Sequence, residues 1–245
     1  MMKFIQPTWQ APPNVRAIST TRVGGVSQVP FDSLNLGSHV GDDPNAVRVN
    51  RQKLQDFAKL PQSPLYLNQV HSTKVIRLPY LGENLDADAV YTDKPNQVCL
   101  VMTADCLPVL FCSRNGKEVA AAHAGWRGLC DGIVESTVSQ FSCESADILA
   151  WFGPAIGETA FQVGQEVVEQ FCAFDNQASS AFIADPTTSG KFFGNLYKLA
   201  QQRLSKLGIQ AISGGDYCTY CDEQRFFSYR RDKQTGRMAT LIWRE

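Results

Sequence analysis

Three side chains suited to binding a soft metal or to nucleophilic chemistry stand beside short apolar segments of the sequence. Cys106 precedes one apolar run, His123 ends a second run shortly before Gly125, and His71 follows a third. These runs span residues 107–112, 119–122 and 65–70. Apolar runs interrupted by glycine and proline predict buried strands, and reactive groups collect where strands pass into loops. We therefore expect all three side chains at strand ends.

A thiolate and two imidazoles form a suitable set of zinc ligands. Catalytic zinc sites use three protein ligands and keep an open position, where a bound water has a pKa near ~7 and can attack an electrophilic carbon. The spacing of His71, Cys106 and His123 neither favours nor opposes such a site, and the chain contains no HExxH or paired CxxC signature. The alternative interpretation is two core histidines and an inert buried cysteine.

A Cys/His hydrolase is the third interpretation of the same residues. Cys106 would be the nucleophile, activated by His123, and the turn formed with Asp105 would supply amides for an oxyanion. Asp105 is also a candidate acid or base beside a metal, because it is adjacent to Cys106. Cys218 and Cys221 form a single CxxC without a second pair, so we expect structural thiols rather than a redox pair.

Two arginines are candidate anion ligands. A helix is predicted over residues 44–60, with Asp42 or Asp43 as its N-cap and Pro44 in its first turn. Arg51 lies on the apolar stripe of this helix, so it either extends its charged end out of the core or reaches into a cleft. Arg22 precedes the glycine pair 24–25, which predicts a turn and offers a weaker anion site.

The elements that must position these residues alternate between strand-like and helix-like patterns. Further strands are predicted at 15–20, 73–78, 97–103 and 147–152, and a closing pair at 226–230 and 238–243. Further helices are predicted after residue 128 and at 164–174 and 195–207. Without repeats or linkers, the chain is expected to form one mixed α/β domain over residues 1–245, with a mixed sheet covered by helices.

Composition excludes several classes of partner. The 245 residues are 44% apolar and 19% charged, with a net charge of −1, which gives no basic field for nucleic acid or for a membrane surface. No apolar run approaches the length of a membrane span, and the first residues lack the apolar core of a secretory signal. We therefore expect a cytoplasmic protein whose eight cysteines are reduced.

Seven segments, taken together, carry a family resemblance along nearly the whole chain. They read TTRVGGVS, LNLGSHVGDDPNAVRVNR, NQVHS, TADCLPVLF, AAHAGWRG, GPAIG and FFSYRRDKQTGRMATLIW. In this order they resemble the YfiH family, also called the laccase-domain or polyphenol oxidase family. The resemblance implies a single α/β domain with a Cys/His hydrolase-like fold. It also implies zinc ligation by His71, Cys106 and His123, phosphate or substrate binding by Arg51 and, more weakly, by Arg22, and no role for Cys221.

The activity that the resemblance implies is chemistry on purine nucleosides. Its members phosphorolyse adenosine, inosine and methylthioadenosine and deaminate adenosine, so the expected partners are a nucleoside and phosphate. Two alternatives stay open: a hydrolase that edits a peptidoglycan precursor such as UDP-muramoyl-serine, and a binding protein that only holds metal. A multicopper laccase is excluded by the total of three histidines, although incidental copper at the three-ligand site would fit. The oligomeric state is left open.

Overall fold

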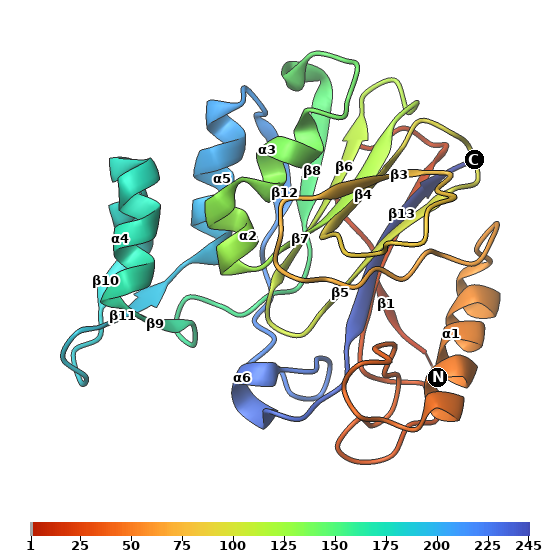
Figure 1. Ribbon diagram of the computed structural model, residues 1–245, viewed down its shortest axis with the longest axis horizontal. Helices are drawn as coiled ribbons and strands as arrows, with labels where there is room; N and C mark the ends of the chain where they lie inside the picture. The colour runs from red at the N-terminus through yellow and green to blue at the C-terminus, as the bar shows by residue number, and fades with distance from the viewer. Residues whose placement is uncertain (1) are drawn as a thin grey trace.

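The computed structural model describes residues 2–245 as stacked layers of helix, sheet, sheet and helix (Figure 1). A six-stranded sheet lies at the centre, with two parallel and three antiparallel strand pairings. Its strands, in spatial order, are β12 (Ala211–Gly214), β8 (Ile148–Phe152), β6 (Leu107–Ser113), β7 (Val119–Ala124), β4 (Ala89–Thr92) and β3 (Val75–Leu78). This architecture confirms the predicted mixed α/β fold.

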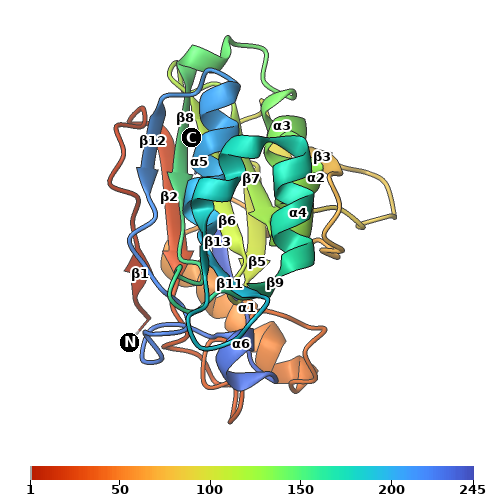
Figure 2. The same cartoon turned by 90° about the vertical axis from the view of Figure 1, so that its left-hand side faces the viewer.

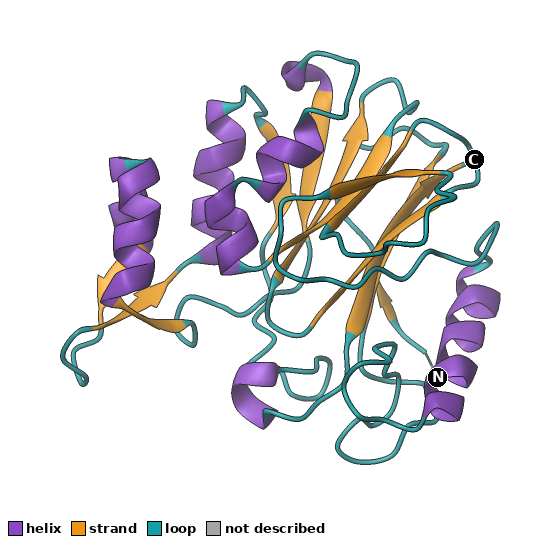
Figure 3. Ribbon diagram, viewed as in Figure 1, coloured by secondary structure: helices purple, strands orange, loops and turns teal. Residues whose placement is uncertain are grey.

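A four-stranded antiparallel sheet packs against one face of the central sheet. Its order is β1 (Phe4–Ile5), β2 (Val15–Thr20), β13 (Met238–Arg244) and β5 (Val98–Thr103). A separate antiparallel sheet of β10 (Phe182–Ala184), β11 (Lys191–Gly194) and β9 (Gln162–Gly164) lies beside helix α4 (Gln165–Phe174) at the margin of the molecule (Figure 3).

Helices cover the two outer faces. The α-helices are α1 (Pro44–Ala58), α2 (Trp126–Asp131), α3 (Ile133–Val138), α4 (Gln165–Phe174), α5 (Leu196–Lys206) and α6 (Tyr229–Asp232), with 3-10 helices η1 (Ser145–Asp147) and η2 (Asn176–Ala181). Helices α2, α3 and α5 lie on the side of the central sheet opposite β1 and β2 (Figure 2). Helix α1 packs its buried Leu54 into the core on the outer side of the four-stranded sheet.

Successive side chains along each central strand point to opposite faces of the sheet, so the core is divided into two parts. On β6, Val109 and Phe111 pack with the helices, whereas Leu110 and Cys112 pack toward the four-stranded sheet. The burial of nearly every side chain on both faces explains why these strands read as continuous apolar runs.

Several predicted elements are confirmed within one or two residues. These are the strands β2, β5, β6, β7, β8 and β13 and the helices α1, α4 and α5. Asp43 caps α1 by accepting a hydrogen bond from the backbone N–H of Asn45 at 2.9 Å, and Asn195 caps α5 in the same way from Lys198.

Three predicted elements differ from the structure. Residues 226–230 are not a strand: Phe226 and Phe227 are both buried in a loop, and Ser228 then caps the short helix α6. The segment 65–70 forms only an isolated bridge at Asn68, so His71 follows a loop. The helix predicted after residue 128 is interrupted at Gly132, whose φ of 105° favours glycine.

Candidate metal centre

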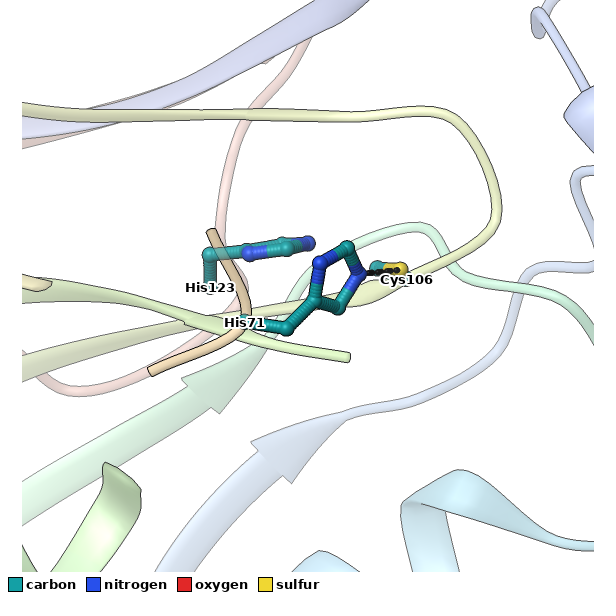
Figure 4. Close-up of side chains that lie close together, drawn as sticks. All are labelled: His71, Cys106 and His123. Carbon is teal, nitrogen blue, oxygen red and sulfur yellow. Dashed lines mark hydrogen bonds between the residues drawn. The ribbon is translucent and has the colours of Figure 1, made fainter. Parts of the chain in front are cut away.

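His71, Cys106 and His123 converge at one end of the central sheet (Figure 4). Their ligand atoms all lie within 4.8 Å of one another, and Sγ of Cys106 is 3.8 Å from Nε2 of His71. Cys106 comes directly before β6, and His123 lies opposite Pro108 on the neighbouring strand β7. His71 reaches the same point from a loop in which its own φ is 61°. The structure thus brings together residues that are widely separated in the sequence.

A buried carboxylate, that of Asp88, holds two of these three residues. It is fully buried and accepts a hydrogen bond from Nδ1 of His123 at 2.8 Å. It also accepts the backbone N–H groups of Val70, His71 and Ser72 at 3.2, 3.0 and 2.6 Å. Because Nδ1 of His123 donates to Asp88, Nε2 faces the cluster and, once it has lost its proton, would offer its lone pair to a metal, as in many metal-binding histidines.

Within the cluster, the thiol and the imidazoles each stabilise the charged form of the other. Burial by itself raises the pKa of the Cys106 thiol, but the adjacent imidazoles of His123 and His71 outweigh burial and lower this pKa to about 6. Burial likewise lowers the pKa of His123, but the Cys106 thiolate and the Asp88 carboxylate raise it to about 9. Hydrogen bonds from His123 and Ser72 overcome burial and hold the pKa of Asp88 below its usual range. The free site therefore favours a thiolate beside an imidazolium.

Gly125 makes room for the cluster. A Cβ atom added at this position would lie 2.6 Å from Cδ2 of His71 and 3.1 Å from Sγ of Cys106. Any side chain here would push the imidazole and the thiol out of their positions. Glycine is therefore required by the close approach of the two side chains rather than by its backbone conformation.

Asp105 is directed away from the three-residue cluster. Its carboxylate oxygens accept hydrogen bonds from the Thr219 hydroxyl and from the backbone N–H of Arg230, each at 2.6 Å. Its carbonyl accepts the N–H of Ile156 at 2.9 Å, and its φ is 90°. These contacts hold the tight turn that presents Cys106, which is a positioning function.

Arg51 lies at the edge of the core and is partly anchored. Its Nε and Nη2 donate to the carbonyl of Leu36 at 3.0 and 2.9 Å, and its guanidinium stacks on the ring of Tyr66 at 3.6 Å. Burial lowers its pKa. Within residues 2–245, its Nη1 donates to no protein acceptor.

Two further basic side chains, His39 and Arg237, lie within electrostatic range of Arg51 and of Cys106, respectively. The pKa of His39 is lowered, first by desolvation and then by the positive charges of Arg237 and Arg51. Burial lowers the pKa of Arg237, while the negative charges of Cys106 and Asp105 act in the opposite sense. No ion pair joins Arg51 or Arg237 to a carboxylate in the described chain. The two arginines therefore retain positive charge for an anion, whereas the lowered pKa of His39 favours its neutral form.

Arg22 belongs to a different part of the molecule. Its guanidinium donates to the backbone and the carboxylate of Asp32 and to the carbonyl of Glu223, and it lies 4.8 Å from the ring centre of Phe227. The surface pocket that it lines includes none of the three cluster residues. Its contacts hold together two loops.

Sequence reasoning did not select Asp88, Gly125, His39 or Arg237. Asp88 stands in the segment DADAV, which resembles an exposed acidic turn because local sequence does not report burial. The tripeptide HAG at 123–125 was a usable signal, since a glycine two residues after a ligand allows close approach.

The donor set fits a zinc ion. One thiolate and two imidazoles provide three ligands, and Asp88 supports His123 from behind. The fit to zinc is chemical, and the same three ligands could also hold copper. With three histidines in the chain, a multicopper centre cannot be assembled.

Comparisons with known proteins find relatives that match the chain along nearly its whole length. A family described as "Multi-copper polyphenol oxidoreductase laccase" matches residues 16–245. A Haemophilus influenzae protein named purine nucleoside phosphorylase is 59% identical over 100% of both chains. Another from Escherichia coli, named purine nucleoside phosphorylase YfiH, is 55% identical over 99% of both.

Solved structures show the same fold. A Neisseria meningitidis protein has a TM-score of 0.94 at 49% identity, covering 99% of both chains. Bacillus licheniformis YfiH has a TM-score of 0.88 at 33% identity, covering 94% of this chain and 93% of its own. Among residues 2–245, no helix combines the length and the apolar character needed to cross a bilayer. The family match, the named relatives and the solved structures together show that the chain belongs to the laccase-domain family that includes YfiH.

Proposed function

We propose that this protein is a metal-dependent purine nucleoside phosphorylase acting on adenosine, inosine and methylthioadenosine. The observation that carries the proposal is the convergence of His71, Cys106 and His123 in a chain 59% identical to a protein of that name. In the reaction, an oxygen of phosphate attacks C1′ of the ribose while the bond from C1′ to the purine breaks. The products are a free purine and a ribose 1-phosphate.

Zinc is the metal proposed for the site. His71, Cys106 and His123 would hold it, and Asp88 would keep His123 in the tautomer that ligation requires. Bound there, zinc would supply Lewis-acid chemistry at neutral pH. The Cys106 thiolate reduces the net charge of the occupied site, and Asp105 fixes the turn that presents it.

Phosphate would bind beside the cationic Arg51 and Arg237, with the neutral imidazole of His39 as a further hydrogen-bonding group. Arg51 is anchored by Leu36 and Tyr66, so its guanidinium is already oriented while its Nη1 group still has N–H donors to offer. Arg237 lies within electrostatic range of both His39 and Cys106. This placement would bring the anion close to the metal ligands. Arg22, which lies in another pocket, is left without a role in binding phosphate.

Adenosine deamination is proposed as a second reaction of the same site. Water would add to C6 of the adenine ring and ammonia would leave, giving inosine. Adenosine is a substrate of both proposed reactions, so one site would serve for both.

The proposal is tested by elemental analysis together with a product assay. The purified protein is expected to contain about one zinc per chain and to convert adenosine and phosphate into adenine and ribose 1-phosphate. His71→Ala and Cys106→Ala should lose both zinc and turnover. Cys172→Ala, on α4 away from the cluster, is the matched control. Full turnover by either site variant would overturn the proposal.

A thiol hydrolase acting on a peptidoglycan precursor is the second candidate. It is favoured by the spatial arrangement of Asp88, His123 and Cys106: the Asp88 carboxylate orients the His123 imidazole, which lies beside the Cys106 thiol. Incubation with UDP-muramoyl-serine distinguishes the two functions. Release of the serine by chelator-treated protein, but not by Cys106→Ala, would support the hydrolase, and an unchanged precursor would reject it.

A further inference from the structure

We propose that Cys218 and Cys221 form a reversible dithiol–disulfide pair whose redox state acts on the turn presenting Cys106. Both thiols are free, and their Sγ atoms are 3.2 Å apart. A disulfide requires a separation of about 2 Å, so closure needs a movement of only about 1 Å. Cys221 is exposed to solvent and Cys218 is half-buried, so an oxidant in solution can reach the pair. This inference does not depend on the phosphorylase assignment.

The turn that carries the two cysteines is held in place from several sides. Sγ of Cys218 accepts the N–H groups of Gly157 at 3.2 Å and of Cys221 at 3.4 Å. The guanidinium of Arg231 donates to the carbonyls of Thr219 and Tyr220, each at 2.9 Å. The two sulfur atoms are therefore already positioned for bond formation, and little conformational freedom remains to be lost.

Thr219, which lies between the two cysteines, connects the pair to the candidate metal centre. It is fully buried, its N–H donates to the carbonyl of Ala155 at 2.9 Å, and its hydroxyl donates to Asp105 at 2.6 Å. Asp105 directly precedes Cys106. A shift of the turn on disulfide closure would reach the Cys106 turn most directly through this buried hydrogen bond.

The oxidation requires a partner of the low-molecular-weight disulfide class, such as glutathione disulfide. The hydrogen bond with Cys218 raises the pKa of Cys221, so its thiolate is the minor form at neutral pH. In that form the exposed Cys221 attacks one sulfur of glutathione disulfide and releases the first glutathione. Cys218 then attacks Sγ of Cys221 in the mixed disulfide and releases the second. The two protein thiols lose two electrons and two protons, and one glutathione disulfide becomes two glutathione molecules.

The first experiment tests the pair itself. The purified full chain is equilibrated with glutathione buffers of increasing disulfide content, and its free thiols are blocked and mapped by mass spectrometry. We expect a bond between Cys218 and Cys221 that forms with one midpoint and is reversed by dithiothreitol. Cys221→Ser should abolish it, and Cys143→Ser should leave it unchanged. Finding only glutathione adducts, or no oxidation at any ratio, would overturn the proposal.

The second experiment tests the coupling with a readout that needs neither turnover nor metal. In chelator-treated protein, the alkylation rate of Cys106 by iodoacetamide is compared between the reduced and the oxidised pair. We expect oxidation to raise this rate several-fold in the wild type and in Thr219→Ser, which keeps the hydroxyl. Thr219→Val should still form the disulfide but show a clearly smaller change at Cys106. Equal rates in reduced and oxidised wild type would overturn the coupling.

Discussion

Asp88 and His123 are joined twice: the Asp88 carboxylate accepts Nδ1–H of His123 at 2.8 Å, and its carbonyl accepts the His123 backbone N–H at 2.7 Å. The same carboxylate accepts the N–H of His71 at 3.0 Å. A single buried group thus sets the ring orientation of one imidazole and the backbone position of the other. The geometry of the cluster depends on Asp88 as much as on its own three members.

Asp88→Asn should weaken zinc binding by roughly 10- to 100-fold, the range for losing a supporting carboxylate behind a histidine ligand. The amide keeps the shape but has only one acceptor oxygen, so some of the bonds to residues 70–72 and to His123 are lost. Competition with a chromophoric chelator measures the affinity. Asp86→Asn, at an exposed carboxylate bound only to Asn68, is the control. Equal affinities for both variants would contradict the role assigned to Asp88.

Gly125→Ala should destabilise the metal-free protein by about 1–3 kcal/mol through overpacking. The new Cβ would lie 2.6 Å from the ring of His71. In a His71→Ala background most of this clash is absent, so the same substitution should cost clearly less. Urea unfolding of the four proteins in this cycle measures the coupling. Purely additive free energies would show that the ring is not what excludes a side chain at Gly125.

The Cys106 thiol should titrate near pH 6 in the metal-free protein. Its alkylation rate should therefore rise through about pH 6 and be nearly flat by pH 8, whereas the buried Cys112, whose pKa burial raises to about 12, should not react in this range. Replacing His123 by Asn removes the imidazolium, so the midpoint should move upward. A midpoint near ~8.5, the ordinary value for a thiol, would contradict the proposed thiolate–imidazolium pair.

The same pKa has a defined effect on stability. Because the folded state holds the Cys106 proton less tightly than the unfolded chain, its stabilising contribution is fully present above the unfolded pKa near ~8.5 and is lost as the pH falls through about 6. The raised pKa of His123 acts oppositely: its contribution is full below the unfolded pKa near ~6.5 and is lost as the pH rises through about 9. Between about pH 6.5 and 8.5 the two contributions change with pH in opposite directions and offset each other, so the wild type should be nearly flat there. The metal-free Cys106→Ser variant keeps only the part of the His123 shift that Asp88 causes, so its stability in urea unfolding should fall as the pH rises through this range.

Arg51→Lys should raise the KM for phosphate by roughly 10-fold or more, equivalent to losing one charge-assisted hydrogen bond. Lysine keeps the positive charge but has no planar group to stack on Tyr66. Its single ammonium group also cannot reproduce the two hydrogen bonds to the Leu36 carbonyl and still offer N–H donors to phosphate. Arg48→Lys, exposed on the same helix, is the control. Initial rates at varied phosphate measure the effect. An unchanged KM for phosphate would separate Arg51 from anion binding.

The sequence by itself determined the regular elements that have a clear period. The stripe containing Val47 and Leu54 predicted α1, and the apolar runs around Cys106 and His123 predicted β6 and β7. Local patterns suffice here because a helix or a buried strand repeats the same relation between neighbouring residues. The motifs along the chain also indicated its family, which the comparisons confirm.

Only the tertiary structure decided which distant groups meet. That His71, Cys106 and His123 share one point depends on the pairing of β6 with β7 and on the loop held by Asp88. The burial of Asp88, the direction of the Asp105 carboxylate toward Thr219, and the loop at 226–228 likewise follow from long-range packing. Spacing along the chain carries no information about such contacts, because each is formed between segments whose separation is set by the whole fold.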